Sequence, residues 1–159
     1  MRPTPIRPAR VDDLPALAAL NAEVQALHFA HRPDQFKPAQ ESDIAPWLER
    51  LLASASTKIW VFEQGGVVLG YVIVLVRERP DNPFCPARTW WEIDQIGVRA
   101  AHRGTGVGQA LIEGVAATAA EHGIAELELC SWAFNESAHR AFERAGFVPK
   151  VIRFERRTR

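Results

Sequence analysis

The chain has few of the residues that would tie it to a metal, a disulfide framework or a membrane. Its 159 residues include only two cysteines, Cys85 and Cys130, which have neither metal-ligand spacing nor the count of a disulfide framework. No stretch is long enough to span a bilayer, since the apolar run from Val67 to Val76 ends at Arg77. No apolar segment typical of a secretory signal follows Met1. We therefore expect a cytoplasmic location, with no bound metal and no membrane partner.

The chain also lacks net charge. Its 19 lysine and arginine residues balance 19 aspartate and glutamate residues, so no net field draws it to nucleic acid. Internal repeats, low-complexity segments and linkers are missing as well. A single domain of this length can bury roughly two thirds of its unfolded surface. We expect one domain over residues 1–159 and no nucleic-acid partner.

The pattern of apolar residues predicts an alternation of strands and helices. Apolar residues recur at helical spacing behind Asp12, and Gly65 and Gly66 separate two β-branched runs as in a hairpin. The chain order is βααβββαβαβ, which fits an α/β class with a mixed central sheet and helices on both sides. The predicted strands lie near Ile6, over 58–63, 67–77, 88–98 and 125–132, and near Val151 to Phe154. The first predicted helix begins at Asp12 and ends before an irregular loop over 31–40, which contains Pro33 and Pro38. The other predicted helices lie over 44–52, from the glycine-rich turn to Gly123, and after Asn135.

A glycine-rich turn connects the strand that ends at Val98 to the next helix. Gly104, Gly106 and Gly108 have no Cβ, so the backbone can adopt positive φ and an anion can lie against successive amide N–H groups. The amphipathic run that follows consists of Leu111, Ile112, Val115 and Ala119. It makes the turn a helix N-terminus, where free N–H donors and the macrodipole favour negative charge. We interpret this segment as a phosphate-binding turn.

Two common phosphate ligands do not fit this turn. A Walker loop ends in Gly-Lys-Ser/Thr, whereas Gly108 is followed by Gln109 and no lysine can reach a β- or γ-phosphate. A dinucleotide fingerprint that begins at Gly104 needs a glycine where Gln109 stands. The turn is therefore not expected to bind a nucleoside triphosphate or NAD.

The remaining pattern resembles a known family. Arg103-x-x-Gly106-x-Gly108 after a strand is similar to the coenzyme A pyrophosphate turn of the GNAT superfamily of acyl-CoA-dependent N-acetyltransferases. The segment from Asn135 to Phe147 resembles the family's second signature, Asn-x-x-Ala, then an aromatic residue on a helix, then Gly-Phe. Ile6 to Asp13 likewise resembles the opening strand and helix start, so the resemblance spans nearly the whole chain.

The resemblance implies a mostly antiparallel central sheet and acetyl-CoA as co-substrate. In this family the pantetheine arm lies between two strands that splay apart, which here correspond to Glu92 to Val98 and Leu127 to Trp132. Gly97 also suits a bulge or a close backbone approach. The residues implied to bind coenzyme A are Ile96, Gly97, Val98, Arg103, Gly104, Thr105, Gly106, Val107, Gly108, Gln109, Asn135, Ala138 and Phe142.

Two acidic residues are candidates for catalysis. Glu92 and Asp94 alternate on one strand, so both carboxylates project from one face, which Ile96 and Val98 continue unless a bulge intervenes. Neighbouring carboxylates raise one pKa and attract a cationic amine. Family members place bases at both equivalent positions. We favour Glu92 as the base and Asp94 as the amine anchor; the alternative is an exposed strand face that carries acids for solubility.

One departure from the family concerns the aromatic residue of the second signature. Many members carry tyrosine there to protonate the leaving thiolate, and this chain has Phe142. An alkyl thiolate of pKa about 8.5 can leave without full protonation. Tyr71, the only tyrosine, and Cys130 are expected to be core residues rather than an acid and a nucleophile. The resemblance places His28, His31 and Phe36 near the acceptor site.

We predict an N-acetyltransferase that transfers an acetyl group from acetyl-CoA to a primary amine by direct attack in a ternary complex. Balanced charge favours a small-molecule acceptor. The alternatives are a peptide or protein N-terminal or lysine acetyltransferase, and a non-catalytic module that senses acyl-CoA. Dimers are frequent in the family that the chain resembles, so a homodimer is one alternative for its oligomeric state.

Overall fold

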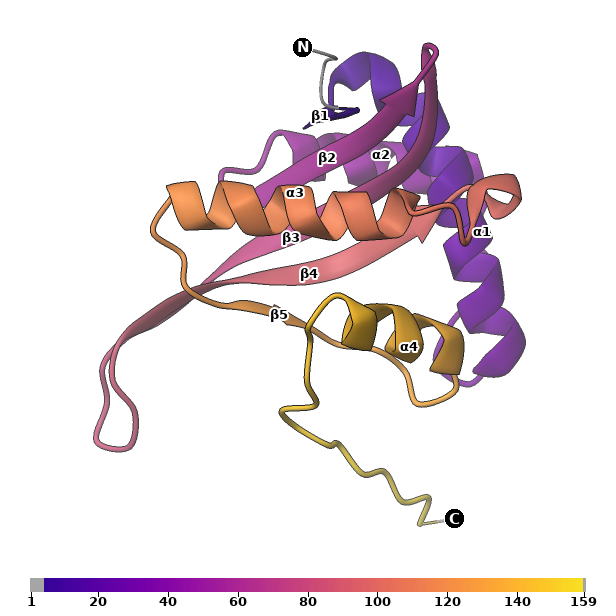
Figure 1. Ribbon diagram of the computed structural model, residues 1–159. Coiled ribbons are helices and arrows are strands. Elements are labelled where there is room, and N and C mark those ends of the chain that lie inside the picture. Colours follow the sequence, from indigo (N-terminus) through magenta and orange to yellow (C-terminus); the bar gives the residue numbers. More distant parts are fainter. Residues whose placement is uncertain (1–4, 159) are drawn as a thin grey trace.

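The computed structural model describes residues 5–158, so residues 1–4 and 159 of the expected domain lie outside the described range. Its centre is a five-stranded sheet in the order β1-β2-β3-β4-β5 (Figure 1). Neighbours from β1 to β4 are antiparallel, and β4 and β5 are parallel. The strands are β1 Ile6–Pro8, β2 Thr57–Gln64, β3 Val67–Arg79, β4 Arg88–Val98 and β5 Leu127–Leu129. The mixed, mostly antiparallel sheet is thus confirmed.

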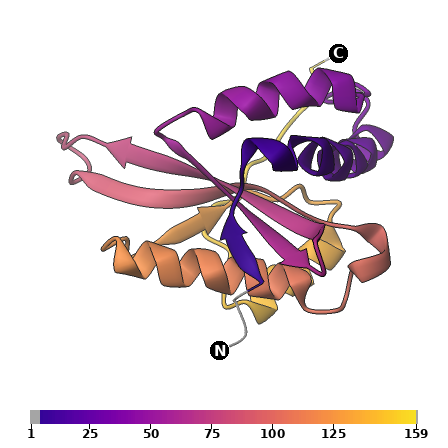
Figure 2. The ribbon, with the colours of Figure 1, turned by 90° about the horizontal axis from the view of Figure 1, so that it is seen from above.

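Helices cover both faces of the sheet, as the sequence predicts. The α-helices are α1 Leu14–His31, α2 Glu41–Leu52, α3 Val107–Glu121 and α4 Glu136–Arg144. Short 3-10 turns, η1 Val11–Asp13 and η2 Ala100–His102, precede α1 and α3. Helices α1 and α2 lie on one face, and α3 and α4 on the other (Figure 2). Within residues 5–158 no helix combines the length and apolar character needed to cross a membrane.

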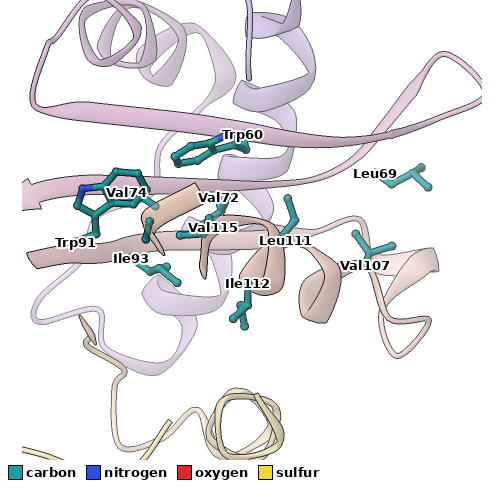
Figure 3. Packing of buried hydrophobic residues seen from close by; sticks show 11 residues of the cluster. Trp60, Leu69, Val72, Val74, Trp91, Ile93, Val107, Leu111, Ile112 and Val115 are labelled. Carbon is teal, nitrogen blue, oxygen red and sulfur yellow. The ribbon is translucent and has the colours of Figure 1, made fainter. Parts of the chain in front are cut away.

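The alternation of side chains along the strands divides the interior into two cores. Figure 3 shows the core between the sheet and α3, which includes Trp60, Trp91 and Leu111. The opposite core joins α1 and α2 to the sheet through residues such as Leu17, Leu48 and Tyr71. Successive residues of a strand point to opposite faces of the sheet. Because helices cover both faces, the central strands carry apolar side chains on both.

A β-bulge interrupts β4 at Asp94. Gln95 pairs with Ile73 of β3 and Ile93 pairs with Val74, so Asp94 has no partner in β3. The sequence suggested Gly97 for a bulge or a close backbone approach, and only the close approach is found. A Cβ at Gly97 would lie 2.5 Å from Cε1 of Tyr71, because the tyrosine ring fills that space.

The predicted last strand near Val151 to Phe154 is wrong. The segment after α4 is extended but pairs with no strand of the described chain, and its apolar side chains are exposed by 72–89%. Ion pairs hold it instead: Lys150 contacts Glu126 and Glu128 of the β5 region, and Glu155 contacts Arg32. The tail therefore leaves α4 without adding to the sheet (Figure 1).

Candidate functional site

The glycine-rich turn between β4 and α3 has the geometry of an anion site. Gly104 (φ +74°) and Gly106 (φ +92°) both adopt the left-handed conformation that favours glycine, and a Cβ at either would meet no atom within 4 Å. Gly106 is the N-cap of α3. Within the described residues, the amide N–H groups from Gly104 to Gln109 have no hydrogen-bond acceptor, and the first helical bond runs from Ala110 to Gly106. These amides lie in the turn and the first turn of α3, at a helix N-terminus.

Cationic groups surround this turn. Nε of Arg103 donates to the carbonyl of Val98 at 3.2 Å, and its guanidinium lies 3.5 Å from the carboxylate of Glu23 on α1. Nε of Arg99 and Nδ1 of His102 are buried without a partner in the described chain. The free amides and the positive charge of Arg103 together fit a phosphate or diphosphate group.

The other predicted residues of the turn keep it in shape. The hydroxyl of Thr105 donates to the carbonyl of His102 at 2.6 Å, and Gln109 donates to Glu113 one helical turn away. Val107 is buried in the core beneath α3. Gly108 is helical, and a Cβ there would lie 3.6 Å from the Val98 side chain. The side chains of Thr105 and Gln109 are thus engaged within the turn and the helix.

Strands β4 and β5 form a split that opens toward the glycine-rich turn. Their parallel pairing begins at Trp91 and Leu127 and ends at Ile93 and Leu129. Beyond that point β4 continues to Val98, paired on one side with β3 only. In the described chain no strand occupies its other side, so backbone groups at that edge of the segment from Ile96 to Val98 can pair with an extended ligand.

The β5 strand ends earlier than the sequence predicts, at Leu129 rather than Trp132. It ends there because the chain diverges from β4, and only paired residues keep strand geometry. Cys130, expected in the core, is exposed for the same reason. That expectation was wrong: beyond the last paired residue no neighbouring strand covers the side chain.

The bulge at Asp94 changes which side chains share a face of β4. Before the bulge Ile93 packs on the α3 side, and after it Ile96 and Val98 do. Ile96 and Val98 therefore do not continue the face of Glu92. They contribute backbone to the split and side chains to the core, whereas Gly97 faces Tyr71 and Val24 on the α1 side.

The two candidate acids have different surroundings. An Nη2 donor of Arg77, on β3, bonds to the Glu92 carboxylate at 2.9 Å, so Glu92 is neutralised by an ion pair. Asp94 has no hydrogen-bond donor among the described residues. Asp94 is exposed on β4. Partial desolvation of its carboxylate and the nearby Glu92 carboxylate raise the pKa of Asp94 above its ordinary value, and Arg77 opposes them. Asp94 is thus the carboxylate of the pair that no hydrogen bond from the described residues holds.

The second signature forms a capped helix beside the split. The Asn135 side chain accepts a hydrogen bond from the amide of Ala138 at 3.4 Å and so caps α4. Phe142 packs against the α3 core and meets the ring of Phe147 edge-on at 6.2 Å. Gly146 adopts φ +87° after the last helical turn and so ends the helix.

Tyr71 is buried, as expected, and it belongs to a small polar network. Asn21 of α1 donates to the Tyr71 hydroxyl at 3.0 Å, and that hydroxyl donates to Gln95 at 3.2 Å. Burial raises the pKa of the Tyr71 hydroxyl well above its usual range, so it is a poor proton donor to a ligand. The network fixes β4 immediately after the bulge.

Sequence reasoning missed Arg77, Asn21 and Gln95. Arg77 marked only the end of an apolar run, and its pairing with Glu92 depends on the register across β3 and β4. Asn21 carried one signal, a polar residue on the apolar face of a predicted helix. Nothing in the pattern distinguished Gln95.

Comparison with known proteins gives a family match. The family model described as "Acetyltransferase (GNAT) family" matches residues 23–147. This range contains the glycine-rich turn, the split and the second signature. Comparison with curated proteins finds no match.

Solved structures share the fold. A tetramutant of the BH1408 protein from Bacillus halodurans is 23% identical with a TM-score of 0.91, over 96% of this chain and 98% of that one. An acetyltransferase from Vibrio fischeri is 22% identical with a TM-score of 0.62, over 78% and 93%. The aminoglycoside N-acetyltransferase AAC(6')-Iy in complex with CoA is 18% identical with a TM-score of 0.75, over 96% and 93%. At these identities the likeness establishes the fold alone.

Proposed function

The chain belongs to the acetyltransferase (GNAT) family, and from this premise we propose that it transfers the acetyl group of acetyl-CoA to a primary amine by direct attack in a ternary complex. Members of this family are acyltransferases that use acetyl-CoA. A small-molecule acceptor is the class that we favour, because the net charge of zero offers no field for a charged macromolecule. A structural relative is named as an aminoglycoside N-acetyltransferase, which acts on a small molecule.

The observation that carries the proposal is the split between β4 and β5 together with the free amides that begin at Gly104. The diphosphate of coenzyme A fits the amides from Gly104 to Gln109, with Arg103 supplying positive charge. An extended arm with peptide groups fits the free edge of Ile96 to Val98. When bound, the thioester supplies an activated acetyl group.

Asp94 is proposed as the residue that takes a proton from the acceptor ammonium, directly or through one water. Its raised pKa and its lack of a partner support this role, whereas Glu92 is held by Arg77. This moves the base role from Glu92, which the sequence favoured, to Asp94. Glu92 then acts on Asp94, whose pKa its nearby carboxylate raises. A backbone N–H at the edge of β4 supports the thioester oxygen as charge develops on it.

No side chain is assigned to protonate the leaving thiolate. Phe142 has no proton to donate, and the Tyr71 hydroxyl is buried and engaged with Asn21 and Gln95. The thiolate therefore leaves as an anion, which an ordinary thiol pKa of about 8.5 permits.

Acetyl transfer is tested by incubating the protein with acetyl-CoA and a panel of primary amines. Thiol release and the mass of the product are measured together. We expect amine-dependent thiol release with a product 42 Da heavier than the amine, since one acetyl group replaces one hydrogen. Asp94→Asn should lower turnover about 100-fold or more while coenzyme A still binds by calorimetry. Binding of coenzyme A without amine-dependent thiol release would favour the sensor module instead.

A further inference from the structure

A cluster of five aromatic rings lies outside both cores. We call it the aromatic roof and define it as His28, His31, Phe36, Trp132 and Phe134. The rings of His31 and Phe134 are stacked, with centroids 4.4 Å apart and planes 7° apart. Phe36 meets Trp132 edge-on at 5.3 Å, and His28 touches both Phe36 and Phe134. The roof thus joins the end of α1 and its following loop to the segment between β5 and α4.

The path of α1 places this roof over the split between β4 and β5. Leu17 packs among residues of β2 and β3, and Asn21 bonds to Tyr71 of β3 and Gln95 of β4. One turn later Val24 lies against Gly97 of β4. The helix therefore advances across the sheet from β2 toward β5, and His28, one turn beyond Val24, comes next after β4. Figure 1 shows the end of α1 reaching the segment between β5 and α4.

The roof retains accessible ring surface, and its two histidines bond back to α1. His28, Phe36, Trp132 and Phe134 are half-buried, and His31 is exposed. Nδ1 donates to a carbonyl of α1, from His28 to Val24 at 2.8 Å and from His31 to Leu27 at 3.0 Å. These bonds hold the imidazoles in place, with His31 parallel to Phe134 and His28 inclined to Phe36 and Phe134 by 57° and 73°.

We propose that the aromatic roof selects an acceptor amine that carries an aromatic ring. This inference rests on the proposed function, because it names the acceptor class of that same site. The ring of the acceptor would pack on the roof while its ammonium points to Asp94 and Glu92 on the α1 side of β4. One ring of the roof already contacts a planar cation, because the Arg32 guanidinium lies 5.1 Å from the centroid of Trp132. Contact between aromatic rings stabilises a complex by more than the buried apolar area alone, so an aromatic acceptor should bind more tightly.

The test compares 2-phenylethylamine with 2-cyclohexylethylamine, which have similar size and the same primary amine. Each is titrated by calorimetry into the protein saturated with coenzyme A, and kcat/KM with acetyl-CoA is measured separately. We expect 2-phenylethylamine to bind about three- to tenfold more tightly and to show the same preference in kcat/KM through KM. Trp132→Leu and Phe36→Leu should each remove most of that preference. Trp47→Leu, a half-buried tryptophan of α2 outside the roof, is the matched control and should keep it.

The outcomes separate this inference from the proposed function. Thiol release with both amines at equal kcat/KM overturns the inference and leaves acetyl transfer standing. Ring-selective binding without any thiol release supports the roof as an aromatic site and overturns acetyl transfer. If Trp132→Leu weakens coenzyme A itself and not the amine, the rings serve the cofactor and the inference is wrong. Failure of both amines to bind also overturns it.

Discussion

At the residue scale, the bulge at Asp94 gives two similar acids different chemistry. Without it Asp94 would pair with β3 in regular alternation like its neighbours. With it, Asp94 is freed from the ladder beside the split, while Glu92 is in reach of Arg77. A single extra residue thus distinguishes an available carboxylate from a neutralised one.

This difference predicts opposite shifts of the pH profile in two variants. Glu92→Gln removes a like charge and releases Arg77, so it should lower the pKa of Asp94. Arg77→Met removes the opposing cation and should raise it. Because a base acts when ionised, the acid limb of kcat should move to lower pH in Glu92→Gln and to higher pH in Arg77→Met, each by about half a unit to one unit. If the acid limb of kcat lies at the same pH in both variants as in the unaltered protein, Asp94 is not the base.

At the scale of elements, the N-terminus of α3 combines the positive φ of two glycines with a set of unpaired amides. A helix start with this geometry is a preformed donor array, and the sequence placed it correctly because turn chemistry is local. The far end of α3 offers a comparison. Gly123 has φ +71° and equally open space around its missing Cβ.

Gly106→Ala and Gly123→Ala therefore form a matched pair. Both put a Cβ on a left-handed backbone, so each should lower the free energy of unfolding by about 1 kcal/mol. Only Gly106→Ala places a methyl group where an anion would lie, and it should weaken coenzyme A at least about tenfold. Urea denaturation and calorimetry measure the two effects. Equal coenzyme A affinity in both variants would place the diphosphate elsewhere.

Strand β1 is fastened to the start of α1 and to β2 by one guanidinium. The two Nη groups of Arg7 donate to the two carboxylate oxygens of Asp13 at 2.8 Å, and the guanidinium also pairs with Glu63. Asp13 is buried, and its hydrogen bonds from Arg7 lower its pKa below the ordinary 3.8. Ionised Asp13 therefore stabilises the fold.

Asp13→Asn should lower the free energy of unfolding by about 2 kcal/mol at pH 7. Since the folded-state pKa is lowered, this contribution is complete above pH 3.8 and is lost as the pH falls toward the folded pKa. The difference between the variant and the unaltered protein should accordingly be constant well above pH 3.8 and shrink as the pH falls below 3.8 in urea titrations. Asp12→Asn, at the exposed neighbouring position, is the control and should change stability little at either pH. A difference that stays constant with pH would contradict the ion-pair account.

At the scale of the whole molecule, the tail after α4 exposes apolar side chains near the β5 edge of the sheet. Strand β5 forms this edge of the sheet, and the side chains of Val151, Ile152 and Phe154 in the tail are exposed to solvent. Exposed apolar side chains beside an open sheet edge are typical of a contact between copies. A homodimer through this surface is therefore a prediction to be tested.

Light scattering after gel filtration tests that expectation. We expect the unaltered protein to elute with the mass of two chains and Phe154→Asp to shift toward one, because a buried charge without a partner opposes association. Activity should survive in the variant, since the tail lies outside the split. A monomer at high protein concentration would leave the exposed tail without an assembly role.

The sequence by itself determined what depends on neighbouring residues. The hairpin at Gly65 and Gly66, the left-handed turn before α3 and the cap at Asn135 all follow from steric freedom or hydrogen bonds within a few residues. The order of the helices and of the first five strands follows from apolar periodicity in the same way. The two family signatures, the glycine-rich turn and the segment from Asn135 to Phe147, could be recognised from the sequence because they depend on such local features.

Tertiary structure alone decided the features that join distant segments. The bulge at Asp94 depends on the register between β3 and β4, and the ion pair from Arg77 to Glu92 depends on that register in turn. The stacking of His31 on Phe134 requires α1 to cross the sheet. The tail near Phe154 had strand periodicity but found no partner, and a strand exists only where a second strand accepts its hydrogen bonds.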